Sequence, residues 1–183
     1  DEMFENSSFN QDISSWDVSS VGRMTNMFKG SDFNQPIGNW DVSNVYNMQG
    51  MFQKTSFNQD IGAWDVSKVT TMFGMFSENS SFNQDISTWD VSNVEAMVAM
   101  FFQNTAFNQD LGSWDVSNVK NMSSMFYLSG FNQDISNWDV SNVASMSNMF
   151  YGSPFNQNIS NWCVILINSE PTNFSTDSPL ALE

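Results

Sequence analysis

Six aspartates share one local sequence, Trp-Asp-Val-Ser, and their carboxylates are the side chains best suited to bind a ligand. Successive copies lie 24 or 25 residues apart, which places the carboxylates at equivalent points of a repeat. They belong to Asp17, Asp41, Asp65, Asp90, Asp115 and Asp139, and the serines two residues later are Ser19, Ser43, Ser67, Ser92, Ser117 and Ser141. Oxygen ligands of this kind bind Ca²⁺. A column of them would equally suit a cationic surface or a hydroxyl-rich glycan.

A simpler interpretation of the same pattern is structural, and we favour it. Asp and Ser side chains often form hydrogen bonds with the backbone or with each other where a chain turns. Every copy of the repeat needs the same turn, so a recurring Asp-Val-Ser is explained without a ligand. Calcium binding along the column from Asp17 to Asp139 therefore stands as the alternative.

A second set of carboxylates follows the Phe-Asn-Gln triplet of the repeat. Pro36 and Asn158 take the same position in two of the copies. Such substitutions are typical of a solvated loop position rather than of a required metal ligand. The carboxylates of this set belong to Asp12, Asp60, Asp85, Asp110 and Asp134.

Composition excludes several classes of site and partner. The chain has no histidine and one cysteine, which excludes His-based catalytic triads, imidazole zinc sites and thiolate cages. It has 20 acidic and 5 basic side chains, and its net charge is -15. That charge repels the phosphates of nucleic acids and the anionic inner face of a membrane. The expected partners are neutral or cationic.

The elements that position the carboxylates are predicted to be coils of a tandem repeat. Each unit reads Phe-Asn-Gln-Asp-Ile-x-x-Trp-Asp-Val-Ser-x-Val-x-x-Met-x-x-Met-Phe and ends in a variable polar loop. A unit of this length cannot bury its own apolar side chains, so the units must stack on one another. The coils start near Phe9, Phe33, Phe57, Phe82, Phe107, Phe131 and Phe155.

Two spacings of apolar residues alternate within each unit. Trp16 and Val18 lie two residues apart, which predicts a short strand with Asp17 pointing outward. The segment from Val21 through Met24 to Phe28 has helical spacing and predicts a short helix or 3₁₀ segment. The predicted fold is a leucine-rich-repeat-like solenoid of about seven coils, with one short parallel β-strand and one short helix or 3₁₀ segment per coil.

The remaining residues that recur in every coil are interpreted as structural. The tryptophan and methionine columns favour a buried core over a sugar-stacking platform or a copper site. The Asn-Gln pairs predict hydrogen-bonded ladders where each coil turns. One-residue insertions before Phe82 and before Phe107 indicate an exposed loop between coils.

The unit resembles the BspA-like leucine-rich-repeat surface proteins. The likeness is to the subgroup with Phe-Asn-Gln-Asp, Trp-Asp-Val-Ser and Met-Phe repeats, which occurs in mycoplasma surface lipoproteins and in marine bacterial and algal proteins. The spacing Ile13-x-x-Trp16-x-Val18-x-x-Val21 matches the core of leucine-rich repeats, with Val where that family usually has Asn. The resemblance covers about residues 3–164. It implies a secreted or surface-exposed protein, commonly an adhesion or ligand-binding module.

We expect residues 1–164 to form a single repeat solenoid and residues 165–183 to form a C-terminal tail or partial cap. The chain starts partway through a repeat, which is typical of a piece of a longer protein, and Leu182 and Glu183 are interpreted as a cloning remnant. The tail resembles the closing segment of bacterial members, in which a second cysteine follows. Cys163 is the single cysteine of this chain, so it is expected either to fill a cap as a small apolar residue or to be an unpaired thiol.

The expected function is a cell-surface or secreted binding or adhesion module that uses the acidic, hydroxyl-rich strand face, with calcium as its one candidate cofactor. Surface proteins or glycans of a host or neighbouring cell are the expected partners, without nucleic acid or membrane insertion. The uncovered coil ends also predict end-to-end self-association. The main alternative is a structural spacer or surface-layer repeat, and a less favoured one is an ice-binding solenoid. Identical coils offer no asymmetric pocket with shifted pKa values, so we do not expect an enzyme.

Overall fold

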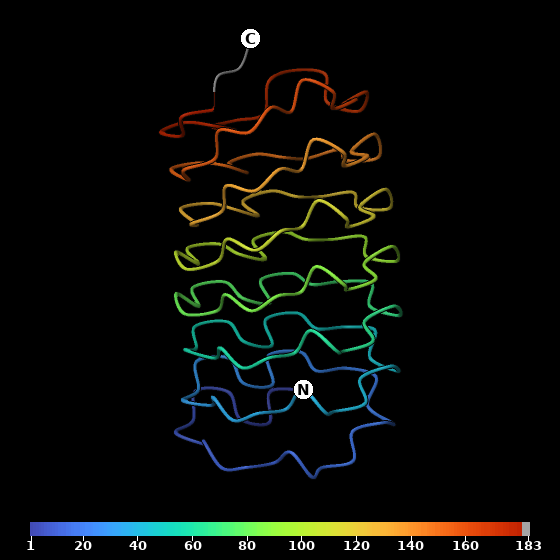
Figure 1. Ribbon diagram of the computed structural model, residues 1–183, viewed down its shortest axis with the longest axis vertical. Coiled ribbons are helices and arrows are strands. Elements are labelled where there is room, and N and C mark those ends of the chain that lie inside the picture. Colours follow the sequence, from blue (N-terminus) through green and yellow to red (C-terminus); the bar gives the residue numbers. More distant parts are fainter. Residues whose placement is uncertain (181–183) are drawn as a thin grey trace.

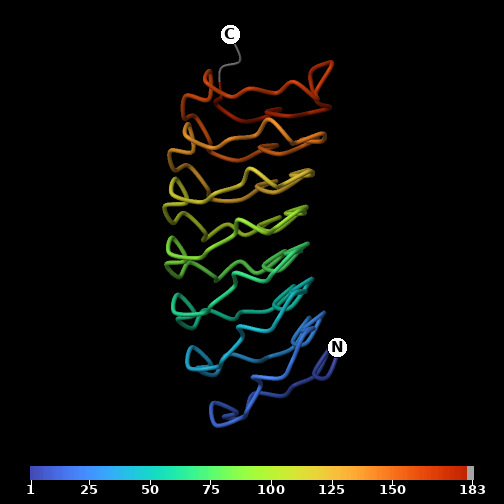
Figure 2. The same ribbon diagram turned by 90° about the vertical axis from the view of Figure 1, so that its right-hand side faces the viewer.

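The protein is a column of stacked coils, described by a computed structural model over residues 1–180 (Figure 1). The chain passes from one end of the column to the other, and each coil lies on the one before it (Figure 2). Residues 24 or 25 apart are therefore neighbours in adjacent coils. The interpretation of Leu182 and Glu183 as a cloning remnant lies outside the described residues.

The predicted leucine-rich-repeat-like solenoid, with a strand and a short helix in each coil, is wrong. Residues 1–180 contain no helix and no strand longer than a single bridge. It follows that none of the described residues forms a helix able to cross a membrane. Adjacent coils share isolated parallel bridges: Arg23 with Asn47, Asn47 with Thr71, Thr71 with Ala96, Ala96 with Asn121, and Asn121 with Ser145.

The predicted strand fails because turns lie on both sides of it. The Trp40 N–H donates to the Ile37 carbonyl at 3.1 Å, and the Val45 N–H donates to the Val42 carbonyl at 2.8 Å. The chain between these two turns is too short to form a strand ladder. Its side chains still alternate, because Trp40 and Val42 are buried while Asp41 is exposed. The inward and outward directions follow the spacing even though no strand forms.

The predicted helix is replaced by turns that bond to the next coil. In an α-helix the Phe28 N–H would donate to the carbonyl of Met24, four residues earlier. Instead it donates to the carbonyl of Met51 in the following coil at 3.0 Å. The Met27 N–H donates to the Met24 carbonyl at 3.2 Å, which closes a turn three residues long. Amides of this segment therefore alternate between a turn in their own coil and a bond to the next one.

Left-handed residues shape these turns and stop a helix from forming. Asn26 has a φ of 53° and Gly30 a φ of 66°, and each is the third residue of a turn. Asn and Gly adopt this conformation more easily than other residues. The equivalent residues of later coils are Gly50 and Lys54, Gly74 and Glu78, Ala99 and Gln103, Ser124 and Leu128, Asn148 and Gly152, and Asn173 and Asp177.

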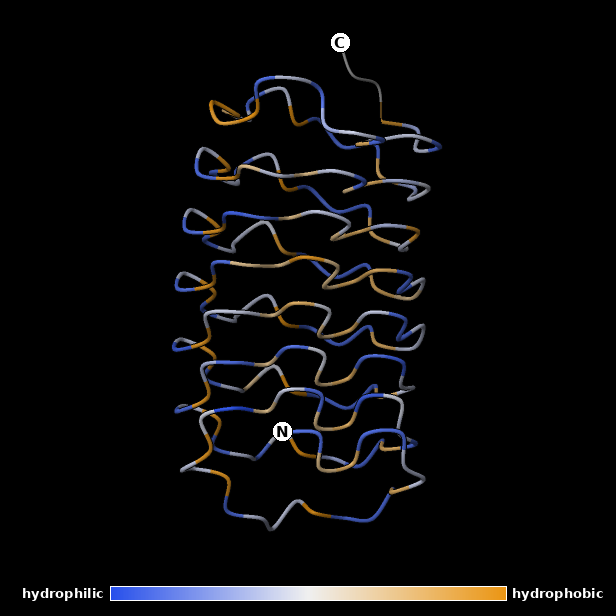
Figure 3. Cartoon of the chain, turned by 180° about the vertical axis from the view of Figure 1, so that it is seen from behind, coloured by the Kyte–Doolittle hydropathy of each residue, from blue (hydrophilic) through white to orange (hydrophobic). Residues whose placement is uncertain are grey.

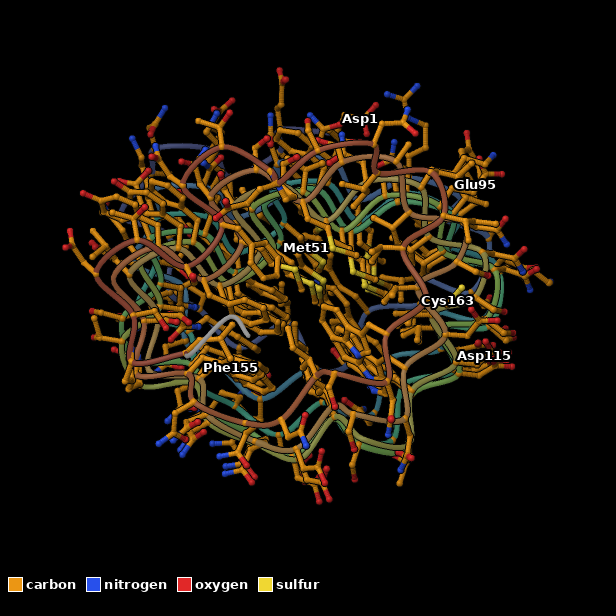
Figure 4. All side chains as sticks on the ribbon, turned by 90° about the horizontal axis from the view of Figure 1, so that it is seen from above. Asp1, Met51, Glu95, Asp115, Phe155 and Cys163 are labelled. Atoms are coloured by element: carbon orange, nitrogen blue, oxygen red, sulfur yellow. The ribbon has the colours of Figure 1, made fainter. Side chains whose placement is uncertain are left out.

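Phenylalanine and methionine columns fill the interior of the stack. Figure 4 shows Met51 and Phe155 pointing into it. The Phe28 ring stacks on Phe33 with a centroid distance of 4.0 Å, and on Phe52 of the next coil at 5.7 Å. Because the same pairs recur in each coil, the rings form two continuous columns along the molecule. The interpretation of the methionines as core residues is confirmed from Met24 to Met149, whereas Met3 is 62% exposed.

The tryptophans join neighbouring coils through both their rings and their indole N–H groups. Trp40 is 4% exposed, and its Nε1–H donates to the Ile13 carbonyl of the preceding coil at 3.1 Å. Trp64, Trp89, Trp114, Trp138 and Trp162 make the equivalent bond. A buried indole needs such an acceptor. Five tryptophans from Trp40 to Trp138 are therefore buried core residues and Trp162 is partly buried, as the sequence indicated, whereas Trp16 in the first coil is 41% exposed.

Asparagine and glutamine form the predicted ladder at the start of each coil. The Oδ1 of Asn10 accepts the Asn34 backbone N–H at 2.9 Å and the Gln35 Nε2–H at 3.0 Å. The ladder continues coil by coil to Asn156. Hydrophobic and hydrophilic segments consequently recur at the same place in successive coils (Figure 3).

Candidate functional site: the acidic face

The six aspartates of the Trp-Asp-Val-Ser motif lie on the outside of the stack and are exposed. Figure 4, a view along the column, shows Asp115 and Cys163 on the same outer side of the stack. We call the surface formed by the six aspartates and their serines the acidic face: Asp17, Asp41, Asp65, Asp90, Asp115, Asp139, Ser19, Ser43, Ser67, Ser92, Ser117 and Ser141. The structure thus brings the predicted residues together in coil order.

Each of these carboxylates is oriented by the serine two residues later in its own coil. Asp17 Oδ1 accepts the Ser19 backbone N–H at 3.0 Å and the Ser19 hydroxyl at 2.6 Å. The amide bond recurs in all six copies. The structural interpretation of Asp-Val-Ser as a turn is therefore confirmed. Because one oxygen makes these bonds, the other oxygen of each carboxylate keeps a fixed direction.

Asparagines one residue after the serines tie the acidic face together across coils. Asn44 Nδ2–H donates to the Ser19 carbonyl of the previous coil at 2.8 Å. Asn93, Asn118 and Asn142 make the same bond. Sequence reasoning missed this ladder, although the recurrence of Asn after Asp-Val-Ser was a signal for it. The acidic face is therefore held by side chain-to-backbone bonds within and between coils.

The hydrogen bonds from serine lower the pKa values of five of these carboxylates and so favour their ionised form. The Ser19 hydroxyl, followed by the Ser19 backbone N–H, lowers the pKa of Asp17 below its ordinary value of 3.8. The same causes lower the pKa of Asp41, although the charges of Asp17 and Asp65 oppose them. The pKa values of Asp65, Asp115 and Asp139 are lowered in the same way. Hydrogen bonding to the charged form therefore outweighs the repulsion between neighbouring carboxylates.

The lowered pKa values predict that the serine hydroxyls stabilise the fold only while the aspartates are ionised. An aspartate with a depressed folded-state pKa contributes stability above its unfolded pKa, here 3.8, and loses it as the pH falls through the lower value. We expect the Ser43→Ala/Ser67→Ala variant to be less stable than wild type in urea denaturation at about pH 7, and the difference to shrink at about pH 2.5. A difference that stays constant or grows in acid would contradict this linkage.

A known family matches most of the chain. Residues 1–73 and residues 53–162 match the family described as mycoplasma protein of unknown function, DUF285. The chain belongs to the DUF285 family. No match was found among curated proteins or among solved structures.

In this DUF285 chain the second set of carboxylates also caps turns. Asp12 Oδ1 accepts the Ser14 N–H at 2.9 Å, which is the main cause of its lowered pKa. Asp60, Asp85, Asp110 and Asp134 accept the equivalent amide of their own coils. Residues 1–180 contain no group of three or more acidic or cysteine side chains arranged to hold a metal ion. Calcium binding by the acidic face stays a prediction.

A half-buried aromatic column on the surface of the DUF285 chain was missed by the sequence reasoning. The rings of Phe102, Tyr127 and Tyr151 stack with centroid distances of 4.7 and 4.8 Å. The charge of Asp177 and its hydrogen bond to Tyr151 raise the pKa of that tyrosine. The signal was the aromatic residue after Met-Phe in three consecutive coils. Because the rings cover one another, mainly their edges face the solvent.

Proposed function

We propose that the acidic face is the binding surface of a non-catalytic adhesion module and that it recognises cationic groups on an extended partner. The observation that supports this proposal is the fixed orientation of each carboxylate by its own serine. A partner would not have to order these side chains on binding, which lowers the entropic cost of association. The lowered pKa values of Asp17 and Asp41 keep these carboxylates charged at a lower pH than an ordinary aspartate.

The repetition of the face favours a multivalent interaction. A single exposed ion pair contributes little, typically below about 1 kcal/mol. Several ion pairs along the acidic face reinforce one another, because the first pair to form raises the effective concentration of the remaining partner groups. The net charge of -15 also attracts a cationic partner from a distance. Such binding must weaken with salt, since the Debye length is about 8 Å at physiological ionic strength.

We also propose that the protein is secreted or lies on the cell surface. It rests on the resemblance of the repeat to BspA-like surface proteins, whose commonly assigned role is adhesion. The partners would be cationic regions of surface proteins on a host or neighbouring cell. A structural spacer is the competing function, and it differs in requiring no ligand on the acidic face.

The test compares two triple variants with the same change in charge. Asp65→Asn/Asp90→Asn/Asp115→Asn removes three carboxylates of the acidic face, and Asn can still accept the serine bonds. Asp60→Asn/Asp85→Asn/Asp110→Asn removes three from the second set in the same coils. We expect the first variant to bind a lysine-rich peptide about tenfold more weakly than wild type in calorimetric titration, and the second to change affinity less than about twofold.

Two results would contradict the proposal. Equal losses in the two variants would mean that net charge, and not the acidic face, attracts the peptide. Failure of the wild-type chain to bind at low salt would favour the structural spacer.

A further inference from the structure

Tyr127 and Tyr151 occupy a position that the repeat does not require to be aromatic. The residue after Met-Phe is Lys29, Gln53 or Ser77 in three earlier coils. The backbone N–H of each of these residues closes the same turn as the N–H of the two tyrosines. The coil therefore folds without an aromatic side chain here, and the two tyrosines are free to serve another purpose.

The backbone holds the two tyrosine rings against each other. The Tyr127 N–H donates to the Ser124 carbonyl at 3.2 Å. The Tyr151 N–H donates to the equivalent Asn148 carbonyl at 3.3 Å, and the Tyr151 carbonyl accepts the Leu128 N–H of the previous coil at 2.7 Å. The rings stack with a centroid distance of 4.8 Å and an angle of 9° between their planes. Groups held this close react with each other much faster than free groups in solution.

Asp177 supplies a proton acceptor for one of the two rings. The Gly152 N–H donates to the Thr176 carbonyl at 2.9 Å, which brings Asp177 alongside Tyr151. The charge of Asp177, followed by its hydrogen bond with the Tyr151 hydroxyl, raises the pKa of that phenol, so Tyr151 keeps its proton in the resting protein. A phenol that loses an electron becomes strongly acidic, and a carboxylate already hydrogen-bonded to it is placed to take the proton.

We propose that Tyr127 and Tyr151 are a site of oxidative cross-linking, at which a peroxidase-type one-electron oxidant joins the two rings into a dityrosine. Each ring gives up one electron and its hydroxyl proton, and the Tyr151 proton passes through Asp177 to water. The two radicals couple by a new carbon–carbon bond between positions ortho to the hydroxyls, and the hydrogens of those two carbons move to the oxygens. One hydrogen peroxide accepts the two electrons and two protons and becomes two molecules of water.

The cross-link joins two adjacent coils by a bond that reducing agents do not break. It closes the loop from Tyr127 to Tyr151 and so constrains the unfolded chain, as a disulfide between the same coils would. The linked chain should therefore unfold at a higher urea concentration than the unlinked chain. This site uses none of the residues of the acidic face and does not depend on the proposed function.

The test treats the whole chain with a peroxidase and one equivalent of hydrogen peroxide at low protein concentration. Cleavage before aspartates, which include Asp134 and Asp139, separates Tyr127 from Tyr151 in an unlinked chain. We expect mass spectrometry to find the two tyrosine peptides joined with the loss of two hydrogen atoms. Dityrosine fluorescence should appear in chains that remain monomeric in denaturing electrophoresis.

Three variants serve as controls. Tyr127→Phe should abolish the link and keep the ring stack, because Phe102 already stacks in the same column at 4.7 Å. Tyr46→Phe removes the third tyrosine, which is 48% exposed and lies in a coil far along the chain from the pair, and should leave the yield unchanged. Asp177→Asn can still accept the phenol hydrogen bond but cannot take the proton, so it should slow the linking.

Three outcomes would contradict the proposal. Dityrosine found only in covalent dimers, with a yield that rises with protein concentration, would show that the stacked pair does not couple within one chain. Oxidised tryptophan or Met3 beside two intact tyrosines would show that the oxidant acts elsewhere. Equal rates of linking in wild type and Asp177→Asn would exclude the transfer of the Tyr151 proton to Asp177.

Discussion

Replacing Phe76 by alanine is expected to lower the free energy of unfolding by about 3 to 5 kcal/mol, as for other buried phenylalanines. The Phe76 ring is fully buried and stacks on Phe82 at 3.8 Å. It also lies between Phe52 and Phe101 of the neighbouring coils, at 5.8 and 5.7 Å. Its removal therefore interrupts both the ring pair of its own loop and the column that joins three coils. Urea denaturation followed by tryptophan fluorescence measures the change.

Phe73, in the same coil, provides the matched control. It is 44% exposed, so Phe73→Ala should change the unfolding free energy by no more than about 0.5 kcal/mol. The two variants delete the same atoms three residues apart. Equal effects would mean that the segment is not arranged with Phe76 inside and Phe73 outside.

Replacing Asn79 by alanine is expected to cost about 2 to 4 kcal/mol, since buried partners left unsatisfied cost about 1 to 3 kcal/mol each. Asn79 is fully buried, and its Oδ1 accepts the N–H groups of Ser81 and Phe82, both at 3.1 Å. Its Nδ2–H donates to the Phe57 carbonyl at 3.0 Å and to Thr55 Oγ1 at 3.3 Å. Thermal and urea denaturation of the Asn79→Ala variant and the wild type would measure this loss of unfolding free energy.

Asn104 is the control for this prediction, because it takes the same place one coil later with fewer bonds. Its Oδ1 accepts the Phe107 N–H at 3.1 Å, while its buried Nδ2 has no partner within residues 1–180. Asn104→Ala should therefore cost at least about 1 kcal/mol less than Asn79→Ala. A larger cost for Asn104→Ala would contradict the bonding that we describe.

These two asparagines also explain how the stack accommodates the one-residue insertions. In a 24-residue coil the Ser31 hydroxyl oxygen accepts the N–H of Phe33, two residues later, at 3.3 Å. In the 25-residue coils the longer side chain of Asn79 or Asn104 reaches the phenylalanine three residues later. The sequence showed the insertions but not this compensation. Seeing it required knowing which amide the side chain must reach.

The period and the inward or outward direction of each side chain could be predicted from the sequence. Apolar residues that recur with the period must face the interior, which correctly placed the recurring tryptophans, methionines and phenylalanines in the core except in the first coil, where Met3 and Trp16 are exposed. Acidic residues between them must face outward, which placed Asp17 and its equivalents on one surface. These inferences needed only the polarity of the residues and the length of the unit.

The secondary structure could not be predicted because the same spacing suits more than one backbone. Met-x-x-Met-Phe brings three side chains to one face in a helix, and also in successive turns with left-handed residues. Gly50 and Gly74 signal the turns, but Ala99 and Ser124 occupy the same conformation with no such signal. The neighbouring coil determines which backbone conformation this segment adopts, because its carbonyls accept every second amide N–H of the segment. That choice depends on contacts a full coil apart in sequence.

The most direct test of this architecture is the NMR scalar coupling across the hydrogen bond of the Phe76 amide. The Phe76 N–H donates to the Met100 carbonyl of the next coil at 2.9 Å. We expect a coupling between the amide nitrogen of Phe76 and the carbonyl carbon of Met100 in the isotopically labelled protein. A coupling to the carbonyl carbon of Met72, four residues earlier, would instead show an α-helix and contradict the stack of turn-built coils.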